Sequence, residues 1–156
     1  MNARAVVIGV GNPDRGDDAA GREVARRLRG MLKSEIDVVE LDGEATSLLL
    51  QLEGADAAFL VDACVSGAPS GTVRRFDLAE DSLSCATFGL SSHGFGLAAA
   101  IDLAKALDLL PRRCVVYAIE GESFGIGAPI SLPVERAIRD LVEALRREIR
   151  DLHNLT

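Results

Sequence analysis

The chain has 156 residues, enough for one domain with its own core, and we expect a single domain over residues 1–156. Hydrophobic residues make up 48% of the sequence but aromatic residues only 4%, without tryptophan, so the core must be aliphatic. The net charge of −7 argues against nucleic acid as a partner, because neutralising phosphates requires clustered lysine and arginine.

The first half of the chain alternates predicted strands with predicted helices. Residues 5–10 form an uninterrupted apolar run that ends at a glycine turn, which is typical of a buried parallel strand. Apolar residues then recur at helical spacing through 17–33, with an arginine-rich outer face. Residues 36–41 indicate a second strand and 45–52 a short helix. The apolar run 57–62 predicts a third strand that ends in an acid.

The second half continues this alternation. Residues 72–77 contain two arginines, which favours a strand near a sheet edge, and residues 78–92 predict a loop. Helical spacing predicts a helix over 94–107, and the apolar run 114–119 predicts the last strand. Residues 133–150 predict an amphipathic helix that has a proline in its first turn. This order predicts an α/β fold with three layers: a mostly parallel, twisted sheet with helices on both faces, of the phosphorylase/hydrolase-like kind.

Cysteine usage and hydropathy indicate a protein of the cytoplasm. The cysteines are odd in number, far apart and without a CxxC pair, which argues against a disulfide framework and a cysteine-based zinc site; they are Cys64, Cys85 and Cys114. No apolar run approaches the ~18 residues of a membrane span. The N-terminal apolar run is too short for a signal peptide. We therefore expect a cytoplasmic location and no membrane partner.

Acidic residues follow several of the predicted strands. In sheets of this kind, ligands bind beyond the carboxyl ends of the strands, so the side chains there are expected to share one rim. The acids concerned are Asp17 and Asp18, Asp42, Asp62, and Glu120. His93 precedes the later helix on the same predicted rim, whereas His153 lies in the polar tail.

Each candidate also has a structural interpretation. One of Asp17 and Asp18 is expected to satisfy backbone N–H groups at the start of the helix, while the other faces the rim. An alternative role for Asp62 is to cap the turn VSGAPSG that follows it. His93 alone would more often be a hydrogen-bonded structural residue than a ligand. Two carboxylates and one imidazole together suit zinc, nickel or a similar divalent ion, with positions open for water or substrate.

Four segments, GVGNPDRGDDAAG, FLVDA, SSHGFGLAAAIDLAKAL and ISLPVERAIRDLVEAL, resemble the hydrogenase maturation endopeptidases in order and spacing. The similarity spans nearly the whole chain. The resemblance implies an endopeptidase that removes the C-terminal extension of a nickel–iron hydrogenase large-subunit precursor after nickel insertion. It also implies Asp18, Asp62 and His93 as metal ligands, with Asp18 chosen over Asp17.

The same resemblance implies a role in cleavage or substrate contact for the turn Asp42-Gly43. This chain departs from the family there, because Glu44-Ala45 replaces the usual Gly-Thr. Asp18 and Asp62 join Asp42 as candidate catalytic residues. A water that is polarised by the metal, or held by a carboxylate such as Asp42, then attacks the scissile peptide.

The implied partner is the nickel-loaded precursor, and the implied metal is the nickel of that substrate, for which zinc or cadmium could substitute. No organic cofactor is expected. Two alternatives stay open: another α/β hydrolase, similar to the peptidyl-tRNA hydrolases in its GVGNP turn, or a non-catalytic maturation factor that binds nickel or the precursor.

Overall fold

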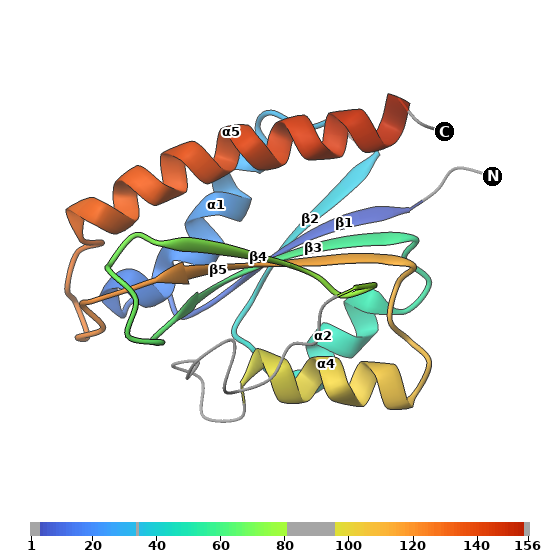
Figure 1. Ribbon diagram of the computed structural model, residues 1–156, viewed down its shortest axis with the longest axis horizontal. Helices are drawn as coiled ribbons and strands as arrows, with labels where there is room; N and C mark the ends of the chain where they lie inside the picture. Colours follow the sequence, from blue (N-terminus) through green and yellow to red (C-terminus); the bar gives the residue numbers. More distant parts are fainter. Residues whose placement is uncertain (1–3, 34, 81–95, 155–156) are drawn as a thin grey trace.

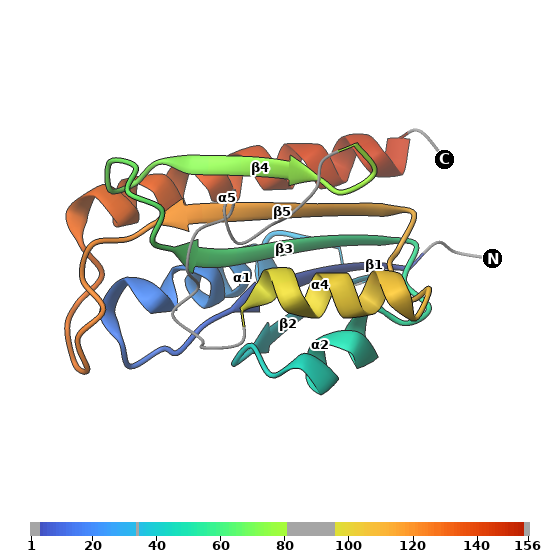
Figure 2. The same ribbon diagram turned by 60° about the horizontal axis from the view of Figure 1, so that its bottom comes forward.

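The computed structural model describes residues 4–33, 35–80 and 96–154, and five strands in this part of the chain form one sheet. Their order across the sheet is β2-β1-β3-β5-β4 (Figure 2). Their bounds are β1 (Ala5–Val10), β2 (Ile36–Leu41), β3 (Ala57–Cys64), β4 (Val73–Asp77) and β5 (Arg113–Glu120). Neighbouring strands are parallel except for β4, which pairs antiparallel with β5 at one edge. The mostly parallel sheet and the edge position of residues 72–77 are therefore confirmed.

Helices cover both faces of this sheet, which confirms the three-layer arrangement (Figure 1). Helices α1 (Ala20–Arg29) and α5 (Leu132–Asn154) pack on one face, and α2 (Ala45–Leu52) and α4 (Leu97–Ala106) pack on the other. Most of the predicted loop 78–92 lies outside the described residues. None of the helices in the described part of the chain combines the length and apolar character needed to span a bilayer.

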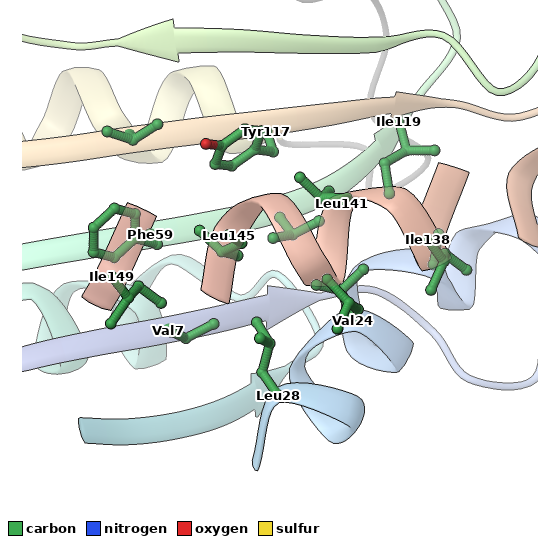
Figure 3. Close-up of a cluster of buried hydrophobic side chains, with 14 of the residues drawn as sticks. Val7, Val24, Leu28, Phe59, Tyr117, Ile119, Ile138, Leu141, Leu145 and Ile149 are labelled. Atoms are coloured by element: carbon green, nitrogen blue, oxygen red, sulfur yellow. The ribbon is translucent and has the colours of Figure 1, made fainter. Parts of the chain in front are cut away.

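The two central strands β1 and β3 are buried along their whole length, since each has helices above and below it. This explains why their sequences are continuous apolar runs rather than alternating ones. On the α1/α5 face, Figure 3 shows Leu145 and Ile149 of α5 packed close to Phe59 of β3. The core is aliphatic with few aromatic rings, as the composition predicts.

Two glycines allow α1 to approach the sheet closely. A Cβ atom on Gly9 of β1 would lie 2.7 Å from the Cβ of Ala25 in α1 and would overlap the carbonyl oxygen of Gly21. A Cβ atom on Gly21 itself would lie 2.6 Å from the carbonyl oxygen of Val10 and would overlap that of Val61. The first turn of α1 therefore sits directly on the carboxyl ends of β1 and β3.

Several predicted boundaries need correction; α4 begins at Leu97 rather than at residue 94, and α5 continues to Asn154 rather than ending at residue 150. Residues Gly16–Ala19 form a separate 3-10 turn, η1, in which the N–H of Asp18 donates to the carbonyl of Arg15. Helix α1 ends at Arg29 rather than reaching residue 33. Strand β3 continues for two residues beyond Asp62, because its pairing with β5 extends to Cys64 and Glu120. Asp62 thus lies within the strand instead of closing it.

Candidate active site

Four acidic side chains are buried at the carboxyl edge of the sheet. Asp17, Asp18 and Asp62 have no exposed surface, and Glu120 is 3% exposed. Side chains alternate along β3, so Asp62 lies on the α2/α4 face together with Leu60 and Cys64. Buried carboxylates are rare unless they are hydrogen-bonded, paired or bound to a metal. These buried acids lie at the edge to which the strand-end rule directs attention.

The approach of α1 to the sheet also brings Asp18 toward Asp62. Asp18 precedes the close contact of Gly21 with Val61 by three residues, and Val61 is the immediate neighbour of Asp62 in β3. A Cβ atom on Gly11 would overlap the carbonyl oxygen of Asp18, so the glycine after β1 lets η1 settle onto the strand end. The backbone N–H of Asn12 donates to Oδ2 of Asp18 at 3.1 Å. The two carboxylates thus come from adjacent elements of one edge.

Asp17 takes the structural role that was predicted for one member of the Asp17–Asp18 pair. Its Oδ2 accepts hydrogen bonds from the backbone N–H groups of Glu122 and Ser123, at 2.9 and 3.0 Å, and from the hydroxyl of Ser131 at 2.9 Å. Its Oδ1 accepts from the N–H of Ser131 at 2.7 Å. These donors belong to the β5–α5 loop and not, as predicted, to the helix that Asp17 begins. Asp17 is therefore a loop anchor.

The turn after β3 is held by Glu120. The N–H of Ser66 donates to Oε2 of Glu120 at 2.8 Å, and the Ser66 hydroxyl donates to Oε1. The sequence offered Asp62 as an alternative cap for this turn. In the structure, Glu120 accepts the hydrogen bonds of Ser66 in that turn. The sequence predicted that Glu120 lies on the rim, but it did not predict that Glu120 holds the turn after β3.

Cys64 and Arg74 lie on the same face of the sheet as Asp62, and sequence reasoning did not select either of them. Nη2 of Arg74 lies 3.8 Å from Sγ of Cys64, and the Arg74 guanidinium stacks 5.6 Å from the ring centre of Phe76. Burial raises the pKa of the Cys64 thiol to about 11, so the thiol is protonated at neutral pH and is a poor nucleophile. The alternation of side chains in the strand VRRFD could have identified Arg74, because it puts Arg74 on the same face of the sheet as the buried Phe76.

The predicted turn Asp42-Gly43 follows β2 and stands apart from the buried acids. Asp42 is exposed, and its Oδ1 accepts a hydrogen bond from the N–H of Glu44 at 3.0 Å. Gly43 has a φ of 97°, a conformation that favours glycine. Strand β1 lies between β2 and β3 in the sheet, so β2 and β3 are about 10 Å apart.

The departure from the family at Glu44 has a local structural effect. The Glu44 carboxylate accepts from the N–H groups of Thr46 and Ser47, at 2.8 and 3.0 Å, and so caps the N-terminus of α2. These backbone hydrogen bonds lower the pKa of the Glu44 carboxyl to about 2. The Glu44 carboxylate is therefore occupied by hydrogen bonds to the first turn of α2.

His93 lies outside the described residues. The helix that follows it in sequence, α4, begins at Leu97 on the same face of the sheet as Asp62 (Figure 2). Across residues 4–33, 35–80 and 96–154, no group of three histidine, cysteine or acidic side chains has an arrangement that could hold a metal ion. These ranges include two of the three predicted ligands, Asp18 and Asp62, but not His93.

Comparison with known proteins supplies the family. A family model described as hydrogenase maturation protease matches residues 22–148, which run from α1 into α5. The chain belongs to the hydrogenase maturation protease family. Membership confirms the predicted peptidase and decides against the other hydrolase and the non-catalytic binding module. Because the match begins after Asp18, the interpretation of the first loop rests on its own residues.

Solved structures of similar fold agree with this membership. The hydrogenase maturating endopeptidase HybD from Escherichia coli is 25% identical, with 95% of this chain and 93% of that chain covered and a TM-score of 0.78. A solution structure of an endopeptidase from the same species is 24% identical over 95% and 93% of the two chains, with a TM-score of 0.82. The HybD protease from Thermococcus kodakarensis is 22% identical over 92% and 97%, with a TM-score of 0.73. No curated protein sequence matches the chain significantly.

Proposed function

We propose that this hydrogenase maturation protease removes the C-terminal extension of a nickel–iron hydrogenase large-subunit precursor, and that Asp18, Asp62 and His93 contact the nickel of that precursor. The observation that carries the proposal is the burial of two carboxylates, Asp18 and Asp62, on adjacent elements of one sheet edge. Carboxylate oxygens are ligands for divalent cations, so two of them at one edge suit a bound cation. The substrate supplies that cation.

The donor set suits a metal that belongs to the substrate. Two carboxylate oxygens and one imidazole nitrogen are ligands that nickel and zinc accept, and they leave positions open for ligands from the precursor. The set contains no thiolate, which would hold such metals more tightly. Zinc or cadmium could replace nickel at this site in vitro, and the reaction requires no organic cofactor.

The chain's own acids then serve the hydrolysis. A carboxylate among Asp18, Asp62 and Asp42 holds and deprotonates the water that attacks the scissile carbonyl, and the same group returns the proton to the leaving amine. The nickel of the substrate can polarise that water when it is in contact with the site. Asp42 is exposed after β2, so a substrate peptide can reach its carboxylate from solvent.

We also propose that the protein acts in the cytoplasm. Cys64 and Cys114 are free and buried, which supports a reducing compartment.

The test is incubation of the purified protein with nickel-loaded and nickel-free precursor, followed by mass measurement of the product. Asp18→Asn, Asp62→Asn and His93→Ala should each reduce cleavage by about 100-fold or more, while Asp102→Asn on the exposed side of α4 should leave it unchanged. Normal cleavage by all three site variants would contradict the assignment of the site. Equal cleavage of nickel-free precursor would contradict nickel recognition alone.

A further inference from the structure

The loop between β5 and α5 presents an isoleucine at the corner of a tight turn. The N–H of Ala128 donates to the carbonyl of Gly125 at 3.1 Å, and the third residue of this turn, Gly127, has a φ of 78°. That combination is typical of a type II turn, in which the second residue points outward. The second residue is Ile126, whose side chain is 88% exposed.

The turn is fixed by the segment that follows β1. The N–H of Gly127 donates to the carbonyl of Asp14 at 2.8 Å, and Nε of Arg15 donates to the carbonyl of Phe124 at 3.2 Å. The N–H of Asp17 donates to the carbonyl of Ser123 at 2.7 Å, in addition to the four hydrogen bonds that the Asp17 carboxylate accepts. Residues 121–131, the braced loop, therefore hold Ile126 in a fixed position. Little conformational entropy of this loop is lost when a partner covers Ile126.

This braced loop borders the candidate active site. Its anchor, Asp17, is the immediate neighbour of Asp18, and both views show the loop at the end of the sheet where β5 terminates (Figures 1 and 2). Two further exposed apolar residues lie at the same end of the sheet. Val65, which is 46% exposed, follows β3, and Leu132, which is 64% exposed, begins α5. The loop is therefore hydrogen-bonded to the segment that leads into Asp18.

Single exposed apolar residues are common on protein surfaces and by themselves indicate nothing. Leu107, which is 53% exposed, ends α4 at the opposite end of the sheet and is an example. Ile126 differs because the most exposed large apolar side chain among the described residues lies on a loop that is hydrogen-bonded to the segment leading into Asp18. Such an arrangement suits a partner that offers an apolar pocket next to its reacting peptide.

We infer that Ile126 is a docking residue for the hydrogenase precursor, inserting into an apolar pocket beside the segment to be cleaved. This inference rests on the proposed function, since it names the surface by which the same substrate is bound. Ile126 does not touch the reacting atoms, so it acts on binding and not on the chemical step.

The experiment compares Ile126→Ser with Leu107→Ser, which each remove a large exposed apolar side chain, at opposite ends of the sheet. Binding of the full-length precursor is measured by calorimetry, and cleavage is measured as KM and kcat. Ile126→Ser should weaken binding and raise KM by about 10- to 100-fold with kcat nearly unchanged, whereas Leu107→Ser should match the wild type. Ile126→Val should lie close to wild type, because it keeps most of the apolar surface.

The outcomes separate the two claims. Wild-type binding and KM in Ile126→Ser, with normal cleavage, would overturn the docking role and leave the proposed function intact. Precursor that binds to the wild type but is never cleaved would overturn the proposed function, and the binding constants would still decide the docking role. A wild type that neither binds nor cleaves the precursor would overturn both. Thermal melting of each variant verifies that the fold is retained.

Discussion

Asp17 and Ser131, 114 residues apart in the sequence, share two hydrogen bonds: Oδ1 of the aspartate accepts from the serine N–H, and Oδ2 accepts from its hydroxyl. Through this contact the loop after β1, which carries Asp18, and the loop before α5, which carries Ile126, form one unit. The carboxylate is completely buried, so its donors are satisfied by the aspartate and not by bulk water.

Replacing Asp17 with alanine should therefore loosen both loops. Three N–H groups and a hydroxyl lose a charged acceptor, and we expect a loss of roughly 3 kcal/mol in the free energy of unfolding. Urea denaturation measures this loss. Asp14→Ala is the control, because Asp14 is exposed and holds Gly127 through its backbone carbonyl. Equal stability of the two variants would show that the buried acceptor contributes nothing.

Gly21→Ala should separate α1 from the strand ends. The new methyl group would overlap the Val61 carbonyl oxygen and lie 2.6 Å from that of Val10, and overpacking of this kind costs about 2 to 3 kcal/mol. Gly30→Ala serves as control, since its nearest neighbour would be 4.0 Å away and its backbone is helical. That control should raise stability by roughly 0.5 kcal/mol. If both variants unfold at the same denaturant concentration, the close approach at Gly21 is wrong.

Tyr117 gives a direct optical measurement of burial. Burial, followed by its hydrogen bond to Glu148, raises the pKa of Tyr117 to about 12. The chain contains one tyrosine and no tryptophan, so absorbance near 295 nm reports this group alone. We expect a titration midpoint near pH 12 in the folded protein and near 10 in urea. A midpoint near 10 without urea would contradict the buried contact.

The raised pKa of Tyr117 also makes the stability of the fold depend on pH. The unfolded chain loses the tyrosine proton at lower pH than the folded chain does, so alkaline conditions favour unfolding. The contribution is fully present below about pH 10 and is lost as the pH rises toward 12. Tyr117→Phe should therefore show a shallower loss of stability in that window.

Glu44 should influence stability at the opposite end of the pH scale. Its folded pKa of about 2 lies below the value of about 4.3 for an unperturbed glutamate, so its stabilising effect is present above the unfolded value. That effect is lost as the pH falls from about 4.3 toward 2. Glu44→Gln removes the titration, and the stability difference between wild type and variant should shrink through this window. A difference independent of pH would contradict the cap.

Cys64→Ala should retain precursor cleavage. The thiol is protonated at neutral pH because burial raises its pKa to about 11, and no step of the proposed hydrolysis uses it. Removal of the sulfur should cost some stability, measurable as a lower melting temperature, with kcat unchanged. Loss of cleavage in a variant that is still folded at the assay temperature would identify Cys64 as a participant in the reaction.

The sequence located the strands well because β1 and β3 are buried on both faces, and continuous apolar runs mark that environment clearly. It predicted the end of β3 wrongly because Asp62 is a polar residue within the strand. The local pattern equally could not separate Asp17 from Asp18, since the partners of Asp17 lie 105 to 114 residues further along the chain. Resemblance favoured Asp18, and the anchoring role of Asp17 is consistent with that choice.

Arg74 and Glu44 illustrate two other limits. The arginines of β4 indicated an edge strand, but period-two alternation was needed to see that Arg74 faces Cys64 while Arg75 faces Tyr117. At Glu44 the chain departs from its family, and the sequence alone does not show that the carboxylate caps α2. Both effects depend on neighbours that only the folded chain brings together.

The anchoring of the first loop by the last one has a consequence for synthesis on the ribosome. Strands β1, β2 and β3 are complete once residue 64 has emerged, and their mutual pairing requires nothing that follows. The donors that fix Asp17 lie between residues 122 and 131, so they leave the ribosome only after most of the chain has been made. Newly made protease therefore completes the rim around Asp18 late, when nearly all of its sequence has been translated.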